Sequence, residues 1–296
     1  MKIFRLLSLL LVVLLASCLN KKKSADTGMP GNESRYVVLA YVTSWGISTP
    51  ETSCLTHINY AFGHVADDNK GIRIDNEPRL QMIVGLKKEK PSLKVLLSVG
   101  GWGSSRFSEM AANDSTRTAF AADCRRVIDK FGLDGIDIDW EYPGSGTAGI
   151  SFSSADKENF TLLMRDVRQA VGKDKLLTIA TAATGRYYDF RAIEPYVDYV
   201  NIMAYDMEEA PFHHAALHCS DMTEEWSCEK AVAGHIAGGF PVQSYNTRFT
   251  FSMDMEPTRR LSLWIIAISY LSTVCIVAGI VWHKFLIWLI PKEQSS

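Results

Sequence analysis

Apolar and polar positions along the chain follow a repeating order in which a short apolar run precedes a helix-like segment. Six runs are rich in β-branched and aromatic residues and predict strands at 36–42, 56–62, 94–99, 135–140, 176–182 and 199–205. Between several of them, apolar positions recur at helical spacing and predict helices over 78–89, 116–130 and 155–171. This alternation predicts an α/β fold with a parallel sheet covered by helices, either doubly wound or closed into a barrel.

Polar and glycine residues gather where the predicted strands end. The pattern occurs three times, at Ser98 with Gly100 and Gly101, at Asp139 with Glu141, and at Tyr205 with Asp206. In a closed (β/α) barrel the active site is built from the carboxyl ends of the strands. The pattern therefore fits a TIM-type (β/α)8 barrel, of which about six strands are recognisable in this chain.

The stretch DGIDIDWEYP, residues 134–143, places carboxylates in what otherwise resembles a buried strand. Because side chains alternate along a strand, Asp137, Asp139 and Glu141 share one face and apolar residues occupy the other. Carboxylates are poor strand formers and are costly to bury, so an acidic core strand indicates function. The alternative is a solvated edge strand, but apolar residues on both sides of the stretch favour burial. Asp134 has the opposite parity, which favours a structural role.

Composition narrows the function classes. The 296 residues are 47% hydrophobic and 22% charged, which is ordinary for a globular protein. A net charge of −2 provides no basic surface for nucleic acid, so we expect no nucleic-acid partner. Cys219 and Cys228 could pair across a loop, but the histidines near them match no familiar ligand spacing. We therefore predict neither a metal site nor a cofactor.

The amino-terminal segment is typical of an exported lipoprotein. Lys2 and Arg5 precede an apolar run over 6–15 that is too short to span a membrane comfortably. The run ends in Leu-Ala-Ser-Cys, which resembles the lipobox of bacterial lipoproteins, with Cys18 as the lipidated residue. Residues 19–34 read as a flexible tether. We expect a membrane-anchored lipoprotein of the bacterial cell envelope, facing the periplasm or the exterior; the alternative is an ordinary signal peptide with a chance cysteine.

Four motifs, in order along the chain, resemble glycoside hydrolase family 18, the chitinase family. The family signature DxxDxDxE corresponds to Asp134, Asp137, Asp139 and Glu141. The stretches HINYAF (57–62), SVGG (98–101) and MAYD (203–206) resemble the family's second, third and sixth strands. The resemblance covers residues 35–241 and implies the barrel that the alternation already indicated.

The resemblance implies a retaining, substrate-assisted hydrolysis of β-1,4-linked N-acetylglucosamine polymers such as chitin. It assigns Glu141 as general acid and then base, Asp139 as the group that orients the substrate's acetamido group, and Tyr205 as a hydrogen-bond partner of that group. Asp137 completes the catalytic set, and we expect Asp137 and Asp139 to share a proton and to raise the pKa of Glu141.

The substrate-binding candidates are Asp206, Trp102, Tyr142 and Met203. Asp206 is expected to contact the sugar, and Trp102 is the favoured stacking platform, whereas the position of Met203 fits barrel lining better than a specific contact. Trp140 is assigned to packing. The competing hypothesis is a non-catalytic, membrane-anchored glycan-binding protein; the presence of Glu141 disfavours a simple lectin.

The family motifs stop after Pro241, although the family barrel has two more strands. Residues 261–282 form a charge-free run flanked by Arg259, Arg260, His283 and Lys284, which predicts a transmembrane helix in a non-homologous tail, 242–296. The other interpretation is a frameshift, because codons for Trp264–Ile268 read from the third base permit the family-like Asp-Tyr-Arg-Asp. Both interpretations describe a carboxyl-terminally truncated barrel, and we expect little or no activity from it and exposed sheet edges that favour aggregation.

Overall fold

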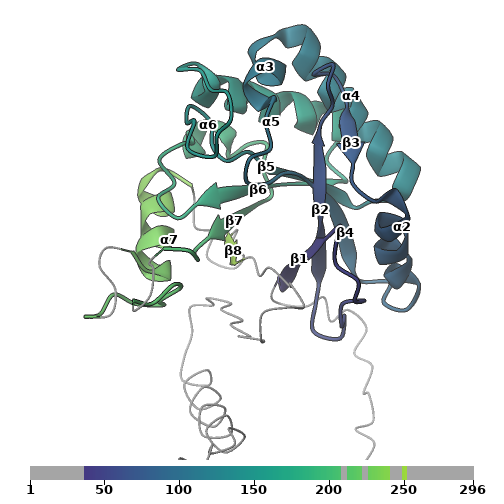
Figure 1. Cartoon of the computed structure of the whole chain (residues 1–296), viewed down its shortest axis with the longest axis horizontal. Coiled ribbons are helices and arrows are strands. Elements are labelled where there is room, and N and C mark those ends of the chain that lie inside the picture. Colours follow the sequence, from purple (N-terminus) through teal and green to yellow (C-terminus); the bar gives the residue numbers. More distant parts are fainter. Residues whose placement is uncertain (1–36, 208–211, 222–225, 241–248, 252–296) are drawn as a thin grey trace, which may run out of the picture. The chain divides into compact units, whose positions relative to one another are not determined.

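One curled sheet organises the chain, and parallel pairing runs through it (Figure 1). The computed structural model describes residues 37–207, 212–221, 226–240 and 249–251. Neighbouring strands follow the order β1-β2-β4-β5-β6-β7-β8, and every pair on this path is parallel. The strands are β1 (Leu39–Thr43), β2 (His57–Val65), β4 (Lys94–Gly100), β5 (Gly135–Asp139), β6 (Leu176–Ala182), β7 (Tyr199–Met203) and β8 (Phe249–Phe251). The short β3 (Ile72–Ile74) is antiparallel to β2.

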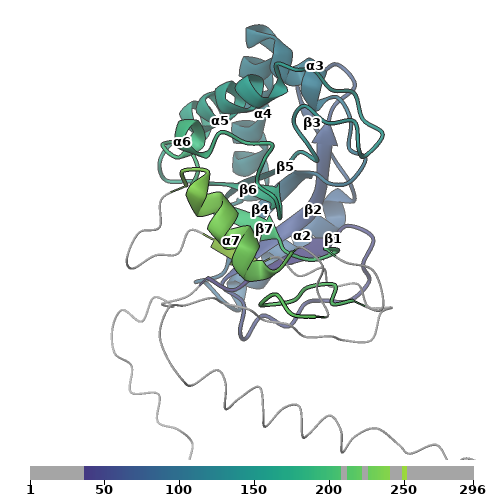
Figure 2. The same ribbon diagram turned by 90° about the vertical axis from the view of Figure 1, so that its left-hand side faces the viewer.

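Helices cover the outer face of this sheet. They are α2 (Glu77–Gly85) with the 3-10 turn η1 (Leu86–Lys88), α3 (Phe107–Ala112), α4 (Asp114–Phe131), α5 (Asp156–Val171), α6 (Phe190–Ile193) and α7 (Cys228–Ala237). Figures 1 and 2 both show α4 and α5 side by side, with α7 near β6 and β7. The fold is the predicted (β/α) barrel, and the described strands leave it incomplete.

The core lies between the sheet and the helices. On β5, the side chains of Ile136 and Ile138 and the Trp140 ring that follows are fully buried in it. The Trp140 ring stacks on Phe107 of α3, with 5.3 Å between the ring centroids. Trp140 is therefore a packing residue, as predicted.

The hydrophobic pattern predicted the six longer strands of the path and helices α2, α4 and α5. It missed β3 and β8, each of three residues, and the short α3 and α6, because so few residues carry no recognisable periodicity. Helix α7 was missed as well, although Ser227 supplies an N-cap signal by accepting a hydrogen bond from the Lys230 amide.

Gly100 lets β4 approach the carboxyl end of β5 very closely. Its φ is +133°, and a Cβ there would lie 1.9 Å from the carbonyl oxygen of Asp139. The next amide, Gly101 N, donates to that same carbonyl over 2.9 Å. The glycine pair therefore lies against the end of β5, two residues before Glu141.

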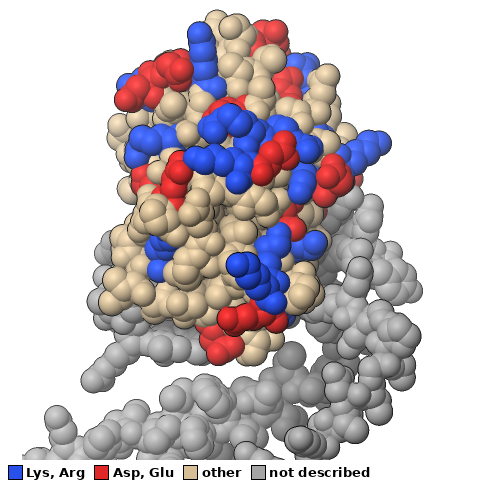
Figure 3. All heavy atoms as spheres, turned by 90° about the vertical axis from the view of Figure 1, so that its right-hand side faces the viewer, with Lys and Arg blue, Asp and Glu red and all other residues tan. Residues whose placement is uncertain are grey.

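Charges of both signs alternate over the face that carries α2 and α4 (Figure 3). Ion pairs join Lys130 to Glu77, at 2.8 Å, and Arg125 to Asp129, at 2.9 Å. Such exposed ion pairs contribute little to stability, and a surface with mixed charges is typical of a solvated face.

Several sequence predictions fall outside the described residues, namely the leader, Cys18, the tether and the apolar run 261–282. Among the residues that the structure does describe, no helix has the length and apolar character needed to cross a membrane. Cys219 and Cys228 are free thiols, so the loop disulfide that the sequence left open does not form.

Candidate active site

Asp137 lies at the centre of a buried polar network inside the curled sheet. Its side chain is fully buried and accepts four hydrogen bonds, donated by the Tyr41 hydroxyl, the Ser98 hydroxyl, the Thr178 hydroxyl and the Asn201 amide at 2.8, 2.7, 2.5 and 3.0 Å. These donors come from β1, β4, β6 and β7. Burial raises the pKa of Asp137, and the four hydrogen bonds oppose that rise.

Asp139, the last residue of β5, is buried without such support. Its side chain is 4% exposed, and within the described residues its Oδ1 atom has no hydrogen-bond partner. Burial, followed by the charges of Glu141 and Asp137, raises the pKa of Asp139 well above its ordinary value. A buried carboxyl oxygen without a partner is a group to which a bound substrate could supply the missing hydrogen bond.

Glu141 lies two residues beyond the end of β5, where the chain leaves the sheet. Its side chain is 8% exposed, and burial raises its pKa from 4.5 to about 7. A hydrogen bond with Tyr142 acts in the opposite direction and lowers the pKa. A carboxyl group with a pKa near neutrality can both donate and accept a proton at physiological pH, as general acid–base catalysis requires.

The cause of the Glu141 shift differs from our expectation. We expected the neighbouring carboxylates to raise the pKa of Glu141, but burial is its principal cause. The repulsion between the carboxylates raises the pKa of Asp139 instead, because Asp139 is the more deeply buried group and receives none of the donors that surround Asp137.

Aromatic rings line the space beside Glu141. Trp102 is 64% exposed and meets Tyr142 edge-on, with 6.4 Å between the ring centroids. On its other side, Tyr142 stacks on Tyr187 at 4.6 Å and an interplanar angle of 6°. An exposed tryptophan next to a stacked tyrosine pair presents flat apolar surface of the kind on which sugar rings pack.

The end of β7 supplies the remaining predicted residues. Met203 closes the strand and is partly buried. The ring centroid of Tyr205 is 6.4 Å from that of His214. Asp206 is exposed and forms an ion pair with His214 at 3.0 Å.

The structure thus gathers Asp137, Asp139, Glu141, Tyr142 and Trp102 around the carboxyl ends of β4 and β5. Asp134 lies at the other end of β5, where its carboxylate pairs with Lys87 at 2.6 Å and accepts from the Val95 amide. That position agrees with the structural role that its parity predicted.

Sequence reasoning missed Tyr41, Thr178, Asn201 and Tyr187. The first three stand in the middle of otherwise apolar strands, which is the same signal that singled out Asp137. A search for buried polar residues on every predicted strand would have found them. Nothing in the sequence pairs Tyr187 with Tyr142, because the two belong to different loops.

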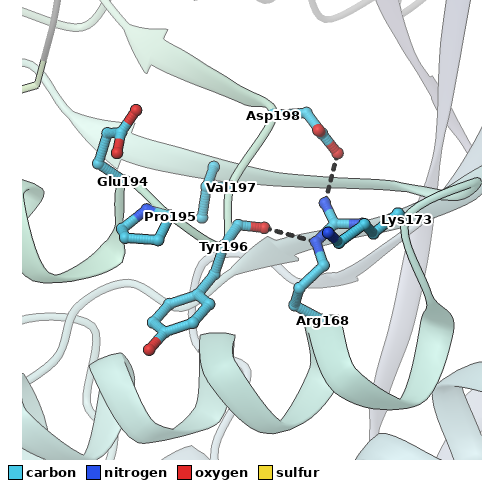
Figure 4. Close-up of a pocket in the computed structure, with 7 residues that line it drawn as sticks. All are labelled: Arg168, Lys173, Glu194, Pro195, Tyr196, Val197 and Asp198. Carbon is cyan, nitrogen blue, oxygen red and sulfur yellow. Dashed lines mark hydrogen bonds and ion pairs between the residues drawn. The ribbon is translucent and has the colours of Figure 1, made fainter.

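A pocket lies at the end of the sheet opposite the carboxylates, where β6 and β7 begin (Figure 4). Arg168 enters it from α5 and donates to the Tyr196 carbonyl and the Asp198 carboxylate, and also to the carbonyls of Gly172 and Lys175. These bonds occupy the guanidinium group and tie α5 to the following strands. The pocket therefore belongs to the end of the barrel that serves stability.

No cluster of three or more His, Cys, Asp or Glu side chains suited to a metal ion occurs in the part of the chain that the structure describes.

The fold and this set of buried carboxylates resemble the barrels of glycoside hydrolases. The family model "Glycosyl hydrolases family 18" matches residues 37–256, so the match continues past Pro241, where we saw the motifs end. The chain belongs to this family.

Curated relatives include a probable chitinase 2 of Drosophila melanogaster, 33% identical over 66% of this chain and 45% of the relative, and chitinase A1 of Niallia circulans, 30% identical over 80% and 43%. Among solved structures, the chitinase domain of a spore coat protein from Clostridium difficile has a TM-score of 0.68 and 33% identity, covering 76% of this chain and 67% of that one. A family 18 N-acetylglucosaminidase from Paenibacillus barengoltzii has a TM-score of 0.66 and 35% identity, covering 73% and 67%. The chain spans less than half the length of these two curated relatives.

Proposed function

We propose that this site hydrolyses β-1,4-linked N-acetylglucosamine polymers, chitin or a related amino-sugar glycan, by a retaining, substrate-assisted mechanism. The observation that carries the proposal is the pair formed by Glu141, with a pKa of about 7, and Asp139, with a buried oxygen that lacks a partner. The chitinases among the relatives support the choice of substrate.

In the proposed reaction, protonated Glu141 donates its proton to the glycosidic oxygen as the bond to the anomeric carbon breaks. The acetamido oxygen of the same sugar attacks the anomeric carbon, and Asp139 accepts a hydrogen bond from the acetamido N–H. Glu141, now a carboxylate, removes a proton from the water that opens the cyclic intermediate. Two displacements at one carbon retain its configuration.

The remaining residues prepare this pair. The four donors around Asp137 hold β5 in place below Asp139. The proposal assigns Tyr205, Asp206 and Met203, at and after the end of β7, to substrate contacts, and Trp102 and Tyr142 to the stacking surface.

The test measures sugar release from soluble N-acetylglucosamine oligomers. It uses this chain and a completed version, which carries the full set of strands of the family barrel, because the sequence motifs predict little activity for the chain as given. Glu141→Gln should reduce the rate of the completed version by about 10²-fold or more, since general acid–base groups contribute about 10² to 10⁴. Glu109→Gln, at an exposed glutamate of α3, is the matched control and should leave the rate unchanged.

A loss of less than about tenfold in Glu141→Gln contradicts the assignment of the general acid. Matched glucose oligomers, which lack the acetamido group, should not be cleaved; their hydrolysis would contradict substrate assistance.

The exposed Trp102 also supports a second candidate, a glycan-binding protein without turnover. If the protein only binds glycans, the completed version should bind the oligomers and release no product, and Glu141→Gln should not change the affinity.

We further propose that Cys18 is lipid-modified and anchors the domain to the bacterial envelope, with 261–282 as a second candidate contact with the membrane.

A further inference from the structure

A second polar cluster lies outside the carboxylate site, formed by His64 at the end of β2, Asp75 after β3 and Ser104 after β4. His64 Nε2 is 3.0 Å from Asp75 Oδ2, and His64 Nδ1 is 2.9 Å from Ser104 Oγ. Ser104 is 9% exposed, and the side chains of His64 and Asp75 are 23% and 34% exposed. The cluster therefore joins the β2–β3 hairpin to the loop that follows β4.

The hydrogen-bond directions in this cluster are determined by chemistry. An ionised carboxylate only accepts, so Asp75 requires the proton on His64 Nε2. In the neutral imidazole Nδ1 is then an acceptor, and the Ser104 hydroxyl must donate to it. Asp75 is itself held by Arg73, through an ion pair, and by its backbone amide, which donates to the Phe62 carbonyl.

Ser104 is the last residue of the turn that presents Trp102. The Ser104 amide donates to the Gly101 carbonyl over 2.9 Å, which closes a four-residue turn with Trp102 at its second position. Gly103, at the third position, has a φ of +78°, as a type II turn requires. The start of the turn rests on Phe62, because a Cβ on Gly101 would lie 2.8 Å from the Phe62 ring.

This turn determines where the Trp102 ring lies relative to Tyr142, whose hydroxyl is hydrogen-bonded to Glu141. The ring is largely exposed, so its own packing restrains it weakly. The side-chain restraint on the far end of the turn comes from His64 through Ser104.

We propose that His64, with its tautomer selected by Asp75, is a positioning residue that holds the Trp102 turn and thereby sets the affinity for the sugar ring that stacks on Trp102. The effect on sugar affinity rests on the proposed function, whereas the role of His64 in holding the turn does not.

Two substitutions of His64 separate its two hydrogen bonds. In His64→Asn, the side-chain amide takes the position of Nδ1 and can still accept the hydrogen bond from Ser104. In His64→Gln, the longer side chain places its amide at the position of Nε2, so that it keeps only the hydrogen bond to Asp75. Ser104→Ala removes the donor, and Ser105→Ala, at the exposed neighbouring serine, is the matched control.

The first measurement is amide hydrogen exchange of residues 101–106 in the full chain, which needs no ligand. We expect faster exchange in His64→Gln and Ser104→Ala, and wild-type exchange in His64→Asn and Ser105→Ala. Unchanged exchange in His64→Gln and Ser104→Ala overturns the proposal, and so does equally fast exchange in His64→Asn, which would indicate a general loss of packing.

The second measurement is calorimetric binding of a soluble N-acetylglucosamine oligomer to the completed version of the protein, with and without the same substitutions. His64→Gln and Ser104→Ala should weaken binding by about three- to tenfold, in the range of a lost aromatic contact, and Trp102→Ala should weaken it at least as much. If Trp102→Ala binds as wild type does, or wild type does not bind, the proposed function fails while the exchange result still decides the role of His64. If Trp102→Ala weakens binding but His64→Gln and Ser104→Ala do not, the proposal that His64 sets the affinity is wrong.

Discussion

At the scale of single residues, three carboxyl groups on one short stretch acquire different properties from their surroundings. Asp137 receives four hydrogen bonds, Asp139 has a buried oxygen with no partner among the described residues, and Glu141 is buried at the exit of the strand. Burial raises the pKa of all three, and only Asp137 has a full set of donors to oppose it. Residue type alone does not distinguish their roles; the neighbours do.

The raised pKa of Glu141 predicts a pH-dependent stability difference between wild type and Glu141→Gln. In the folded protein the group keeps its proton up to about pH 7, whereas the unfolded chain loses it near 4.5. The contribution of protonated Glu141 to the free energy of unfolding is therefore fully present below pH 4.5 and is lost as the pH rises through 7. Above pH 7 Glu141→Gln should be the more stable protein by up to ~3 kcal/mol, and below pH 4.5 the two should be equal.

Urea unfolding of both proteins from pH 4 to pH 8 measures this difference. The two proteins must be compared at the same pH, because other groups also make stability depend on pH. Burial lowers the pKa values of His57 and His235 to about 4, so these histidines make the folded protein more stable as the pH rises. Glu109→Gln should parallel wild type throughout. A stability difference that does not vary with pH would show that Glu141 titrates normally.

At the scale of elements, the carboxyl end of β4 determines the position of the carboxyl end of β5. Gly100 pairs with Asp139 in the register, and the backbone contact between them has no room for a side chain. The catalytic candidates therefore depend on a close approach between two strands, and the positive φ of Gly100 is part of it.

Gly100→Ala should accordingly unfold or strongly destabilise the protein, by more than ~3 kcal/mol, because the new Cβ meets the Asp139 carbonyl in a strained backbone region. Gly85→Ala is the matched control. Gly85 ends α2 with a helical φ of −57°, and nothing lies within 4 Å of a Cβ there, so alanine should stabilise by ~0.5–1 kcal/mol. Thermal unfolding of the two variants tests this; equal midpoints would exclude the close approach.

At the scale of the whole molecule, the sheet path begins at β1 and ends at β8, and these two strands do not pair with each other in the described part of the chain. Exposed strand edges invite association, so the aggregation expected from the sequence stays a prediction. The anchoring of the domain also belongs to this scale, since it depends on residues outside the described ranges.

Lipid attachment at Cys18 predicts that a bacterial host incorporates a labelled fatty acid into the full chain. Cys18→Ser should abolish incorporation, because that residue follows the apolar run and supplies the thiol. Cys54→Ser, at an exposed free cysteine of the barrel, should leave incorporation unchanged. Labelling of the Cys18→Ser protein would refute the anchor. The measurement is independent of residues 261–282, which could retain the protein in membranes by themselves.

The order of strands and helices and the unusual acidity of β5 could be predicted from the sequence, because strand and helix periodicities are local and a carboxylate is conspicuous in any apolar run. The sequence also located Glu141 and Trp102, since both follow predicted strand ends.

Which of these groups contact one another depends on the three-dimensional fold. The partners of Asp137 lie on β1, β4, β6 and β7, and His64 reaches Ser104 across forty residues of chain. Such contacts depend on the curvature of the sheet, for which a linear pattern holds no signal. The pKa of Glu141 was decided in the same way, because it follows from burial, and burial is a property of the assembled barrel.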